Sequence, residues 1–251
     1  MKGKVYIVGA GPGDAGLLTL KALDLIRIAD IVLYDRLVSD DILKMIPNNV
    51  QKVFVGRNVG DDYAHQEETN KLMVQHANGG KKVVRLKGGD PFIFGRGGEE
   101  AEFLRENKID FEIVPGISSA TASPAYAGIP LTHRLLSSSV AIVTGHEDAK
   151  KDELTVRWKE LAKAVDTIVI LMGMGRLKQI VDDLVSAGMS KNTDVAIIEN
   201  GTTKEQKVLH GNLSNIVDKV KNSNIKPPAI IVIGKVAGLT DKLNWLGAEN
   251  A

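Results

Sequence analysis

Short runs of apolar and β-branched residues alternate along the chain with longer segments whose apolar residues recur every three or four positions. In the first half, the runs predict buried strands at Lys4–Val8, Ile31–Tyr34, Lys52–Val55, Lys82–Leu86 and Phe111–Val114. In the second half, they predict strands at Val140–Thr144, Thr167–Leu171, Val195–Glu199, Lys207–His210 and Ala229–Ile233. Strands separated by helices indicate βαβ units and a mostly parallel sheet.

Helical spacing and end signals fill the gaps between several of these strands. The residues that carry them are Leu18, Ala22, Leu25 and Ala29 on one face, Ser39 as an N-cap, Gly98–Asn107, and Ile180–Val185 followed by Gly188. The strand at Lys207–His210 follows its predecessor after a short turn that contains Gly201. This turn predicts a hairpin, so we expect the second sheet to be mixed.

The texture of the chain changes between Pro115 and Ser139, where Gly, Pro and Ser are frequent. We interpret this stretch as a short helix and a linker between two α/β domains. The expected division is an N-terminal α/β domain over 1–115, a connecting helix and linker over 116–139, and a C-terminal α/β domain over 140–251.

Composition excludes several kinds of protein. Of the 251 residues, 43% are hydrophobic and 25% are charged, which is typical of a folded globular chain. The net charge of +1 gives no reason to expect a nucleic-acid or membrane partner. Cysteine is absent, which excludes disulfides, thiolate metal sites and cysteine nucleophiles, and no His/acid spacing indicates a metal site. No apolar run approaches the roughly 20 residues of a membrane helix, so we expect a cytoplasmic protein.

Glycine-rich segments follow five of the predicted strands. They are Gly9–Asp14, Lys87–Pro91, Val114–Ser119, Met172–Gly175 and Glu199–Thr202. Ligands of open α/β sheets bind beyond the carboxyl ends of the strands, where glycine lets them approach the backbone. Any one of these segments could be an ordinary turn, but five of them after five strands favour a shared ligand site.

The first segment also invites comparison with a dinucleotide-binding fingerprint. Gly9–Asp14 has the first two glycines of that pattern, but Asp14 replaces the third. A match shifted to Gly11–Gly16, with Asp35 as the ribose ligand, places Pro12 inside the turn and an anion where pyrophosphate should bind. An oxidoreductase that binds nucleotides is therefore the weaker alternative.

Six motifs together resemble a known family. They are Val8–Asp14, Tyr34–Val38, Arg85–Gly97, Val114–Ser119, Gly128–Arg134 and Thr144–Glu147. In this order they resemble the uroporphyrinogen-III C-methyltransferases, class III S-adenosylmethionine-dependent enzymes that methylate tetrapyrroles. The first and third motifs are shared with other precorrin methyltransferases and diphthine synthase, whereas Tyr34–Val38 and Gly128–Arg134 are more particular to this family. The resemblance spans about residues 3 to 240 and is to the family's single-function form, without the dehydrogenase and chelatase module of fused siroheme synthases.

The resemblance implies that S-adenosylmethionine lies folded between two α/β domains and leaves as S-adenosylhomocysteine. The implied cofactor-binding residues are Pro12, Gly88, Gly89, Asp90, Ile93, Ser118, Ser119, Met172, Gly201 and Ala229. Ser118 and Ser119 stand where the family more often has Thr and Ala. The alternatives are purely structural roles. Asp90 would be a turn cap before Pro91, and Ile93 and Met172 would be core residues.

The acceptor that the resemblance implies is a tetrapyrrole with eight carboxylates, methylated twice through precorrin-1 to precorrin-2 for cobalamin or siroheme synthesis. Arg36, Arg96 and Arg134 are the expected carboxylate-binding residues, unless they are ordinary surface residues. Asp35 matches the family's proposed proton acceptor. Arg57 stands where the family often has Lys as proton donor, and because a guanidinium is not deprotonated we expect electrostatic stabilisation or carboxylate binding instead.

Three further expectations concern assembly and the alternative functions. The resemblance implies a homodimer. Another precorrin methyltransferase is the nearest alternative function. A non-catalytic protein that senses the cofactor is a remote one.

Overall fold

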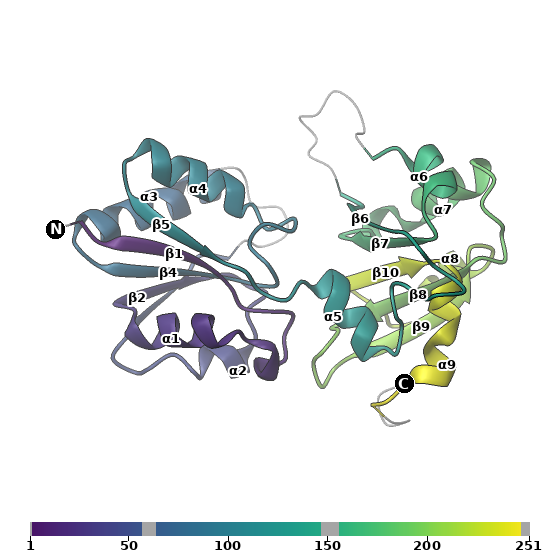
Figure 1. The fold of residues 1–251 in the computed structure, drawn as a ribbon, viewed down its shortest axis with the longest axis horizontal. Coiled ribbons are helices and arrows are strands. Elements are labelled where there is room, and N and C mark those ends of the chain that lie inside the picture. The colour runs from purple at the N-terminus through teal and green to yellow at the C-terminus, as the bar shows by residue number, and fades with distance from the viewer. Residues whose placement is uncertain (1, 57–63, 147–155, 247–251) are drawn as a thin grey trace. The chain divides into compact units, whose positions relative to one another are not determined.

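The computed structural model describes residues 2–56, 64–146 and 156–246. The chain divides into two units, Met1–Ser118 and Ser119–Ala251, and each contains a five-stranded sheet (Figure 1). Every predicted strand is present, with ends within two residues of those expected. Among the described residues, no helix combines the length and the hydropathy needed to cross a membrane.

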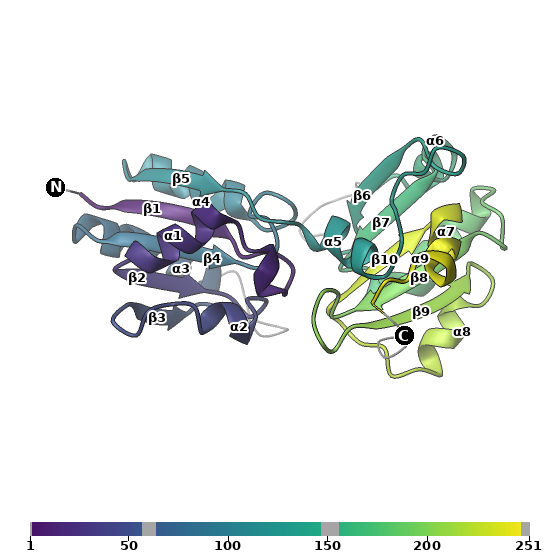
Figure 2. The ribbon, with the colours of Figure 1, turned by 60° about the horizontal axis from the view of Figure 1, so that its bottom comes forward.

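The sheet of the first unit is entirely parallel, with the order β3-β2-β4-β1-β5. Its strands are β1 (Lys4–Gly9), β2 (Ile31–Tyr34), β3 (Gln51–Phe54), β4 (Lys82–Lys87) and β5 (Asp110–Val114). Figure 2 shows this order running from β3 to β5. In the dinucleotide-binding fold β1 lies beside β2, whereas here β4 separates them. The oxidoreductase alternative is therefore wrong in its topology.

Helices cover both faces of this sheet, α1 and α2 on one and α3 and α4 on the other (Figure 1). They are α1 (Leu20–Ile28), α2 (Asp40–Leu43), α3 (Ala64–Asn78) and α4 (Gly97–Glu106), with a 3-10 turn η1 (Ala15–Leu17). Successive strand residues point to opposite faces. On β4, Val84 and Leu86 join the core beneath α1, and Val83 joins the core beneath α3 and α4. Both faces are buried, which explains the near-continuous apolar strands.

The second unit has a mixed sheet with the order β6-β7-β10-β8-β9, as the predicted hairpin required. Its strands are β6 (Val140–Thr144), β7 (Thr167–Leu171), β8 (Asp194–Glu199), β9 (Lys207–Asn212) and β10 (Ala229–Ile233). Among the described strand pairs of this second sheet, β6–β7 is parallel and the other three are antiparallel. The helical elements are α5 (Ser119–Tyr126), α6 (Trp158–Ala164), η2 (Met174–Arg176), α7 (Leu177–Ser186), α8 (Ile216–Lys221), η3 (Lys235–Leu239) and α9 (Thr240–Leu243).

The helix-end predictions had mixed outcomes. Gly188 follows the end of α7 with a φ of 99°, which confirms its place as the residue after the cap. Ser39 precedes α2 but makes no capping bond, because its Oγ donates to the carbonyl of Gly13 at 2.7 Å. The side chain of Asp14 accepts from the amide of Gly16 at 2.7 Å and caps η1, which places the chain's own carboxylate at that turn.

Glu112 on β5 pairs with two lysines, Lys4 on the neighbouring strand β1 and Lys21 on α1. Its carboxylate pairs with Lys21 and, at 2.6 Å, with Lys4, and these hydrogen bonds lower the pKa of Glu112 from 4.5 to about 2. Because the folded-state pKa is lowered, the stabilisation is complete above about pH 4.5 and is lost as the pH falls towards 2.

We expect Glu112→Gln to flatten the pH dependence of the free energy of unfolding in this window. The side chain is 30% exposed, so solvent screening limits the difference to about 1 kcal/mol. Urea unfolding at several pH values measures it, with Glu68→Gln on α3 as an exposed control. Parallel pH curves for Glu112→Gln and the wild type would contradict the assignment.

Candidate functional site

The segments that follow β1, β4 and β5 pack directly on one another at the carboxyl edge of the first sheet. Gly11 and Gly89 exchange backbone hydrogen bonds of 3.1 and 2.7 Å. The amide of Gly116 donates to the carboxylate of Asp90 at 3.1 Å. Three of the five glycine-rich segments therefore meet at one edge, as the sequence predicted.

The close approach of these segments is itself a reason for their glycines. A Cβ atom at Gly116 would lie 2.3 Å from the carbonyl oxygen of Gly89, and one at Gly9 would lie 2.6 Å from the same oxygen. Both distances are shorter than real Cβ contacts. Gly9 and Gly116 are thus needed because the loops pack closely on one another. The expectation of ligand access did not include this close packing.

Asp90 holds two pieces of backbone in place. One carboxylate oxygen accepts from the amide of Phe92 at 2.8 Å, and the other accepts from Gly116. The structure therefore shows the structural role that the sequence left open, a turn cap next to Pro91. It adds a hydrogen bond to Gly116, in the segment after β5. An ionised carboxylate has about four acceptor sites, so Asp90 keeps the capacity to bind a ribose hydroxyl.

Asp35 lies immediately after β2 and reaches the same edge. Its Oδ1 accepts from the amides of Leu37 at 3.1 Å and Gly88 at 3.4 Å. Its Oδ2 lies 3.7 Å from Nη2 of Arg85, and the side chain is 24% exposed. The predicted proton acceptor therefore contacts the glycine-rich segment after β4 and remains accessible.

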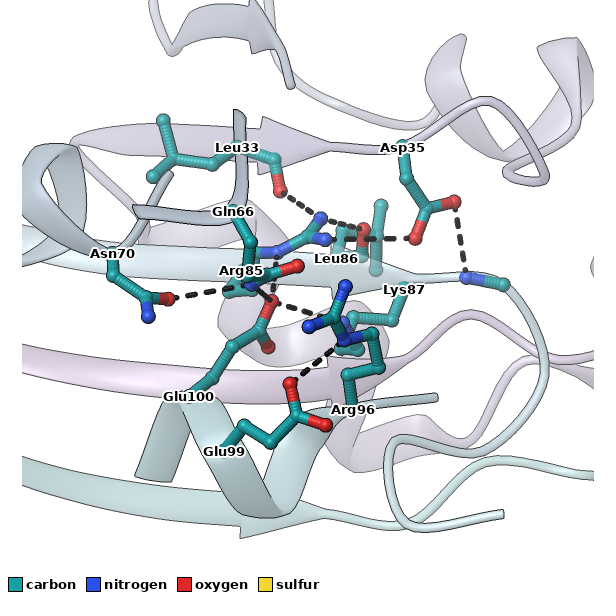
Figure 3. Close-up of polar contacts among 11 residues, drawn as sticks. Leu33, Asp35, Gln66, Asn70, Arg85, Leu86, Lys87, Arg96, Glu99 and Glu100 are labelled. Carbon is teal, nitrogen blue, oxygen red and sulfur yellow. Dashed lines mark hydrogen bonds and ion pairs between the residues drawn. The ribbon is translucent and has the colours of Figure 1, made fainter. Parts of the chain in front are cut away.

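A cluster of buried charged side chains, formed by Arg85, Lys87 and Glu100, lies next to Asp35 (Figure 3). Oε1 of Glu100, which is fully buried on α4, accepts from Arg85 at 3.0 Å, Lys87 at 3.0 Å and Gln66 at 3.2 Å. Burial acts to raise the pKa of Glu100, but Arg85 and Lys87 outweigh it and hold this pKa below its usual value. Burial, and secondly the charge of Arg85, lower the pKa of Lys87.

The sequence patterns did not lead us to this cluster. Arg85 and Lys87 alternate with Leu86 on β4, whose other buried residues are apolar, so they share the face of Val83 beneath α3 and α4. Two cations at this spacing inside a buried strand need a buried anion. That requirement was the available signal, and Glu100 meets it.

The other predicted residues of this unit lie in the same strand-end segments. Ile93 is 41% exposed between Phe92 and Phe94, so its interpretation as a core residue is wrong. Arg96, at a φ of 61°, pairs with Glu99 at 2.7 Å.

The remaining predicted residues are placed by the elements they adjoin. Pro12 follows β1 and Arg36 follows β2. Ser118 ends this unit, and Ser119 begins α5 in the next. Arg57 lies outside the described residues.

In the second unit, three predicted cofactor residues share one edge of the mixed sheet. Strands β7 and β8 are both antiparallel to β10, so both end where β10 begins. This geometry places Met172 after β7, Gly201 after β8 and Ala229 at the start of β10 beside one another along the edge. Met172 is 51% exposed with a φ of 56°, so its interpretation as a core residue is also wrong.

Arg134 has a different location in this unit. It is exposed in the turn of His133 and Ser137, whose backbones pair at 2.9 Å. The hydroxyl of Ser137 bonds that of Thr167, the first residue of β7, at 2.8 Å. The turn therefore lies near the start of β7, whereas Met172 follows the end of that strand. This geometry does not support a site shared by Arg134 and Met172.

Sequence similarity to known proteins shows which family this chain belongs to. The model of the family described as Tetrapyrrole (Corrin/Porphyrin) Methylases matches residues 4–217, and the chain belongs to this family. A siroheme synthase from Salmonella schwarzengrund is 50% identical over 244 residues, which are 97% of this chain and 52% of that protein. The chain thus spans about half the length of the curated relatives that it matches.

Two solved structures are similar over nearly the whole chain. Uroporphyrin-III C-methyl transferase from Thermus thermophilus, complexed with S-adenyl homocysteine, is 39% identical, with a TM-score of 0.81 over 94% of this chain and 100% of that one. A cobalamin biosynthetic enzyme, cobalt precorrin-4 methyltransferase, is 31% identical, with a TM-score of 0.82 over 93% of this chain and 95% of that one.

Proposed function

We propose that this chain transfers methyl groups from S-adenosylmethionine to two carbon atoms of uroporphyrinogen III, through precorrin-1 to precorrin-2. The proposal rests on the 39% identity of this chain to the Thermus thermophilus enzyme over that enzyme's full length. The identity to cobalt precorrin-4 methyltransferase is lower, at 31%, which makes a later precorrin substrate the second candidate.

Each of the two sheet edges, taken by itself, has residues that suit a part of S-adenosylmethionine. Met172 and Ile93 present exposed apolar side chains, as an adenine ring requires, and Met172 holds a backbone conformation that is strained for a residue with a side chain. Backbone groups of the glycine-rich segments can bind the polar end without a charge. The proposed cofactor residues are Pro12, Gly88, Gly89, Asp90, Ile93, Ser118, Ser119, Met172, Gly201 and Ala229.

The chemistry requires little more than orientation and one base. When bound, S-adenosylmethionine supplies an electrophilic methyl group, so alignment with the pyrrole carbon provides much of the rate. The methylated ring is cationic and must lose a proton, and we assign Asp35 as its acceptor, a role supported by the 24% exposure of its side chain. Arg36 and Arg96 are the proposed partners of substrate carboxylates, and Arg57 the proposed stabiliser of charge.

S-adenosylhomocysteine should bind with a dissociation constant in the micromolar range or below and raise the melting temperature by mass action. We expect Met172→Ala to weaken this binding about tenfold, because it removes an exposed apolar contact worth about 1–2 kcal/mol. Titration calorimetry measures both effects, with the exposed Leu135→Ala as control. Unchanged affinity in Met172→Ala removes this edge from the site, and binding of NAD(P) instead overturns the proposal.

A homodimer and a cytoplasmic location, which we also propose, rest on the family resemblance and on composition, and both stay predictions. Light scattering during gel filtration tests the first.

A further inference from the structure

Four charged side chains form one connected set between β2, β4 and α4 (Figure 3). Arg85 is its centre, because its Nε lies 3.0 Å from Oε1 of Glu100 and its Nη2 lies 3.7 Å from Oδ2 of Asp35. Lys87 adds a second cation to Glu100 at 3.0 Å. The set contains two cations and two carboxylates, so it is neutral when all four are charged.

The Arg85 guanidinium is fixed by its surroundings. Its Nη1 donates to the carbonyls of Leu86 at 3.2 Å and Leu33 at 3.5 Å, while Nε is committed to Glu100. The side chain is only 5% exposed. A planar guanidinium held by several acceptors cannot turn without breaking hydrogen bonds in a buried place. The cation that faces Asp35 therefore has one orientation.

The same set is anchored from α3. Gln66 donates to Oε1 of Glu100 at 3.2 Å and to the side chain of Asn70 at 3.3 Å. Glu100 therefore receives three donors on one oxygen, from two elements of the unit. Gln66 thus adds a contact from α3 to a carboxylate that otherwise binds only side chains of β4 through this oxygen.

Only one of the four charged groups is accessible to a substrate. The side chains of Arg85, Lys87 and Glu100 are exposed by 5%, 5% and 0%, and that of Asp35 by 24%. The amides of Leu37 and Gly88 hold the other oxygen of Asp35. The carboxylate therefore has partners at both oxygens, backbone amides at Oδ1 and the ion pair with Arg85 at Oδ2.

We propose that Arg85 is a positioning residue for Asp35, and that Glu100 in turn fixes Arg85. The inference rests on the proposed function, in which Asp35 accepts the proton lost from the methylated ring. Arg85 orients the carboxylate through the ion pair at 3.7 Å, and it touches neither cofactor nor substrate.

The test is a double-mutant cycle on methyl transfer with Arg85→Lys and Asp35→Asn. Lysine keeps the charge, but its ammonium is a compact point charge on a flexible stem and lacks the rigid planar fork whose Nε faces Glu100 while its Nη2 faces Asp35. We expect Arg85→Lys to lower kcat about 10–100-fold, the range for a slightly misplaced catalytic group, with substrate KM and S-adenosylhomocysteine affinity nearly unchanged. In the Asp35→Asn background the same change should have no further effect, because its target is gone. Single-turnover transfer of a labelled methyl group keeps these slow rates measurable.

Two other variants complete the design. Arg27→Lys, at an exposed position on α1, is the matched control and should keep the wild-type rate. Gln66→Leu removes one donor from Glu100 and tests the same coupling if Arg85→Lys does not fold, with an expected loss of about threefold that disappears in the Asp35→Asn background.

The outcomes separate this inference from the proposed function. Equal losses in both backgrounds, or a raised KM at constant kcat, overturn the positioning role of Arg85. A wild-type rate in Asp35→Asn alone overturns the role of Asp35. Failure of the wild type to bind S-adenosylhomocysteine overturns the proposed cofactor.

Discussion

Replacement of Asp35 by asparagine should lower kcat about 10²–10⁴-fold, the usual cost of removing a general base. Asparagine is nearly isosteric and keeps an oxygen that can accept from the amides of Leu37 and Gly88. The change therefore removes charge and basicity while it preserves shape. Rates of methyl transfer, S-adenosylhomocysteine affinity and melting temperature are measured on the same preparation.

The three measurements distinguish the roles open to Asp35. A purely structural acid predicts a lower melting temperature and a nearly normal rate, and a ribose ligand predicts weaker cofactor binding. A base predicts a slow enzyme with normal binding. Asp24→Asn, at an exposed position on α1, is the control. A loss of kcat of less than about threefold would show that Asp35 is not the base, because it is far smaller than the loss expected when a general base is removed.

Glu100→Leu should strongly destabilise the first unit, lowering the free energy of unfolding by about 3–5 kcal/mol. Leucine fits the space, but it leaves Arg85 and Lys87 buried without the carboxylate that binds both at 3.0 Å. The cost comes from these uncompensated cations rather than from the lost attraction. Urea unfolding followed by circular dichroism measures it.

Glu99→Leu is the matched control one residue away on α4. Glu99 pairs with Arg96 at 2.7 Å, but its side chain is 56% exposed, so its loss should cost less than about 1 kcal/mol. Equal stability of the two variants would mean that the buried cluster does not depend on Glu100.

The central strands of both sheets could be predicted because both of their faces are covered. A strand buried on both sides must be apolar and β-branched over its length, and β7 and β10 carry this signal without interruption. The hairpin between β8 and β9 was predictable from the short turn at Gly201. The parallel order of the first sheet followed from helices between its strands.

The contacts of charged and polar side chains could not be predicted in the same way. Sequence spacing placed Ser39 at a helix start, but the carbonyl of Gly13, distant in sequence, takes its hydroxyl. Asp35 was predicted from resemblance, whereas its contact with Arg85 and the link from Arg85 to Glu100 depend on how α4 packs on β4. Partners distant in sequence are chosen by tertiary packing, and local patterns do not record that choice.

The most direct test of the central claim is incubation of the chain with S-adenosylmethionine and uroporphyrinogen III under anaerobic conditions, followed by mass spectrometry of the tetrapyrrole. The account predicts a product that has gained two methyl groups, by way of a singly methylated intermediate, and one S-adenosylhomocysteine for each methyl group transferred. An unmethylated tetrapyrrole, from protein that is folded and binds S-adenosylhomocysteine, would contradict it.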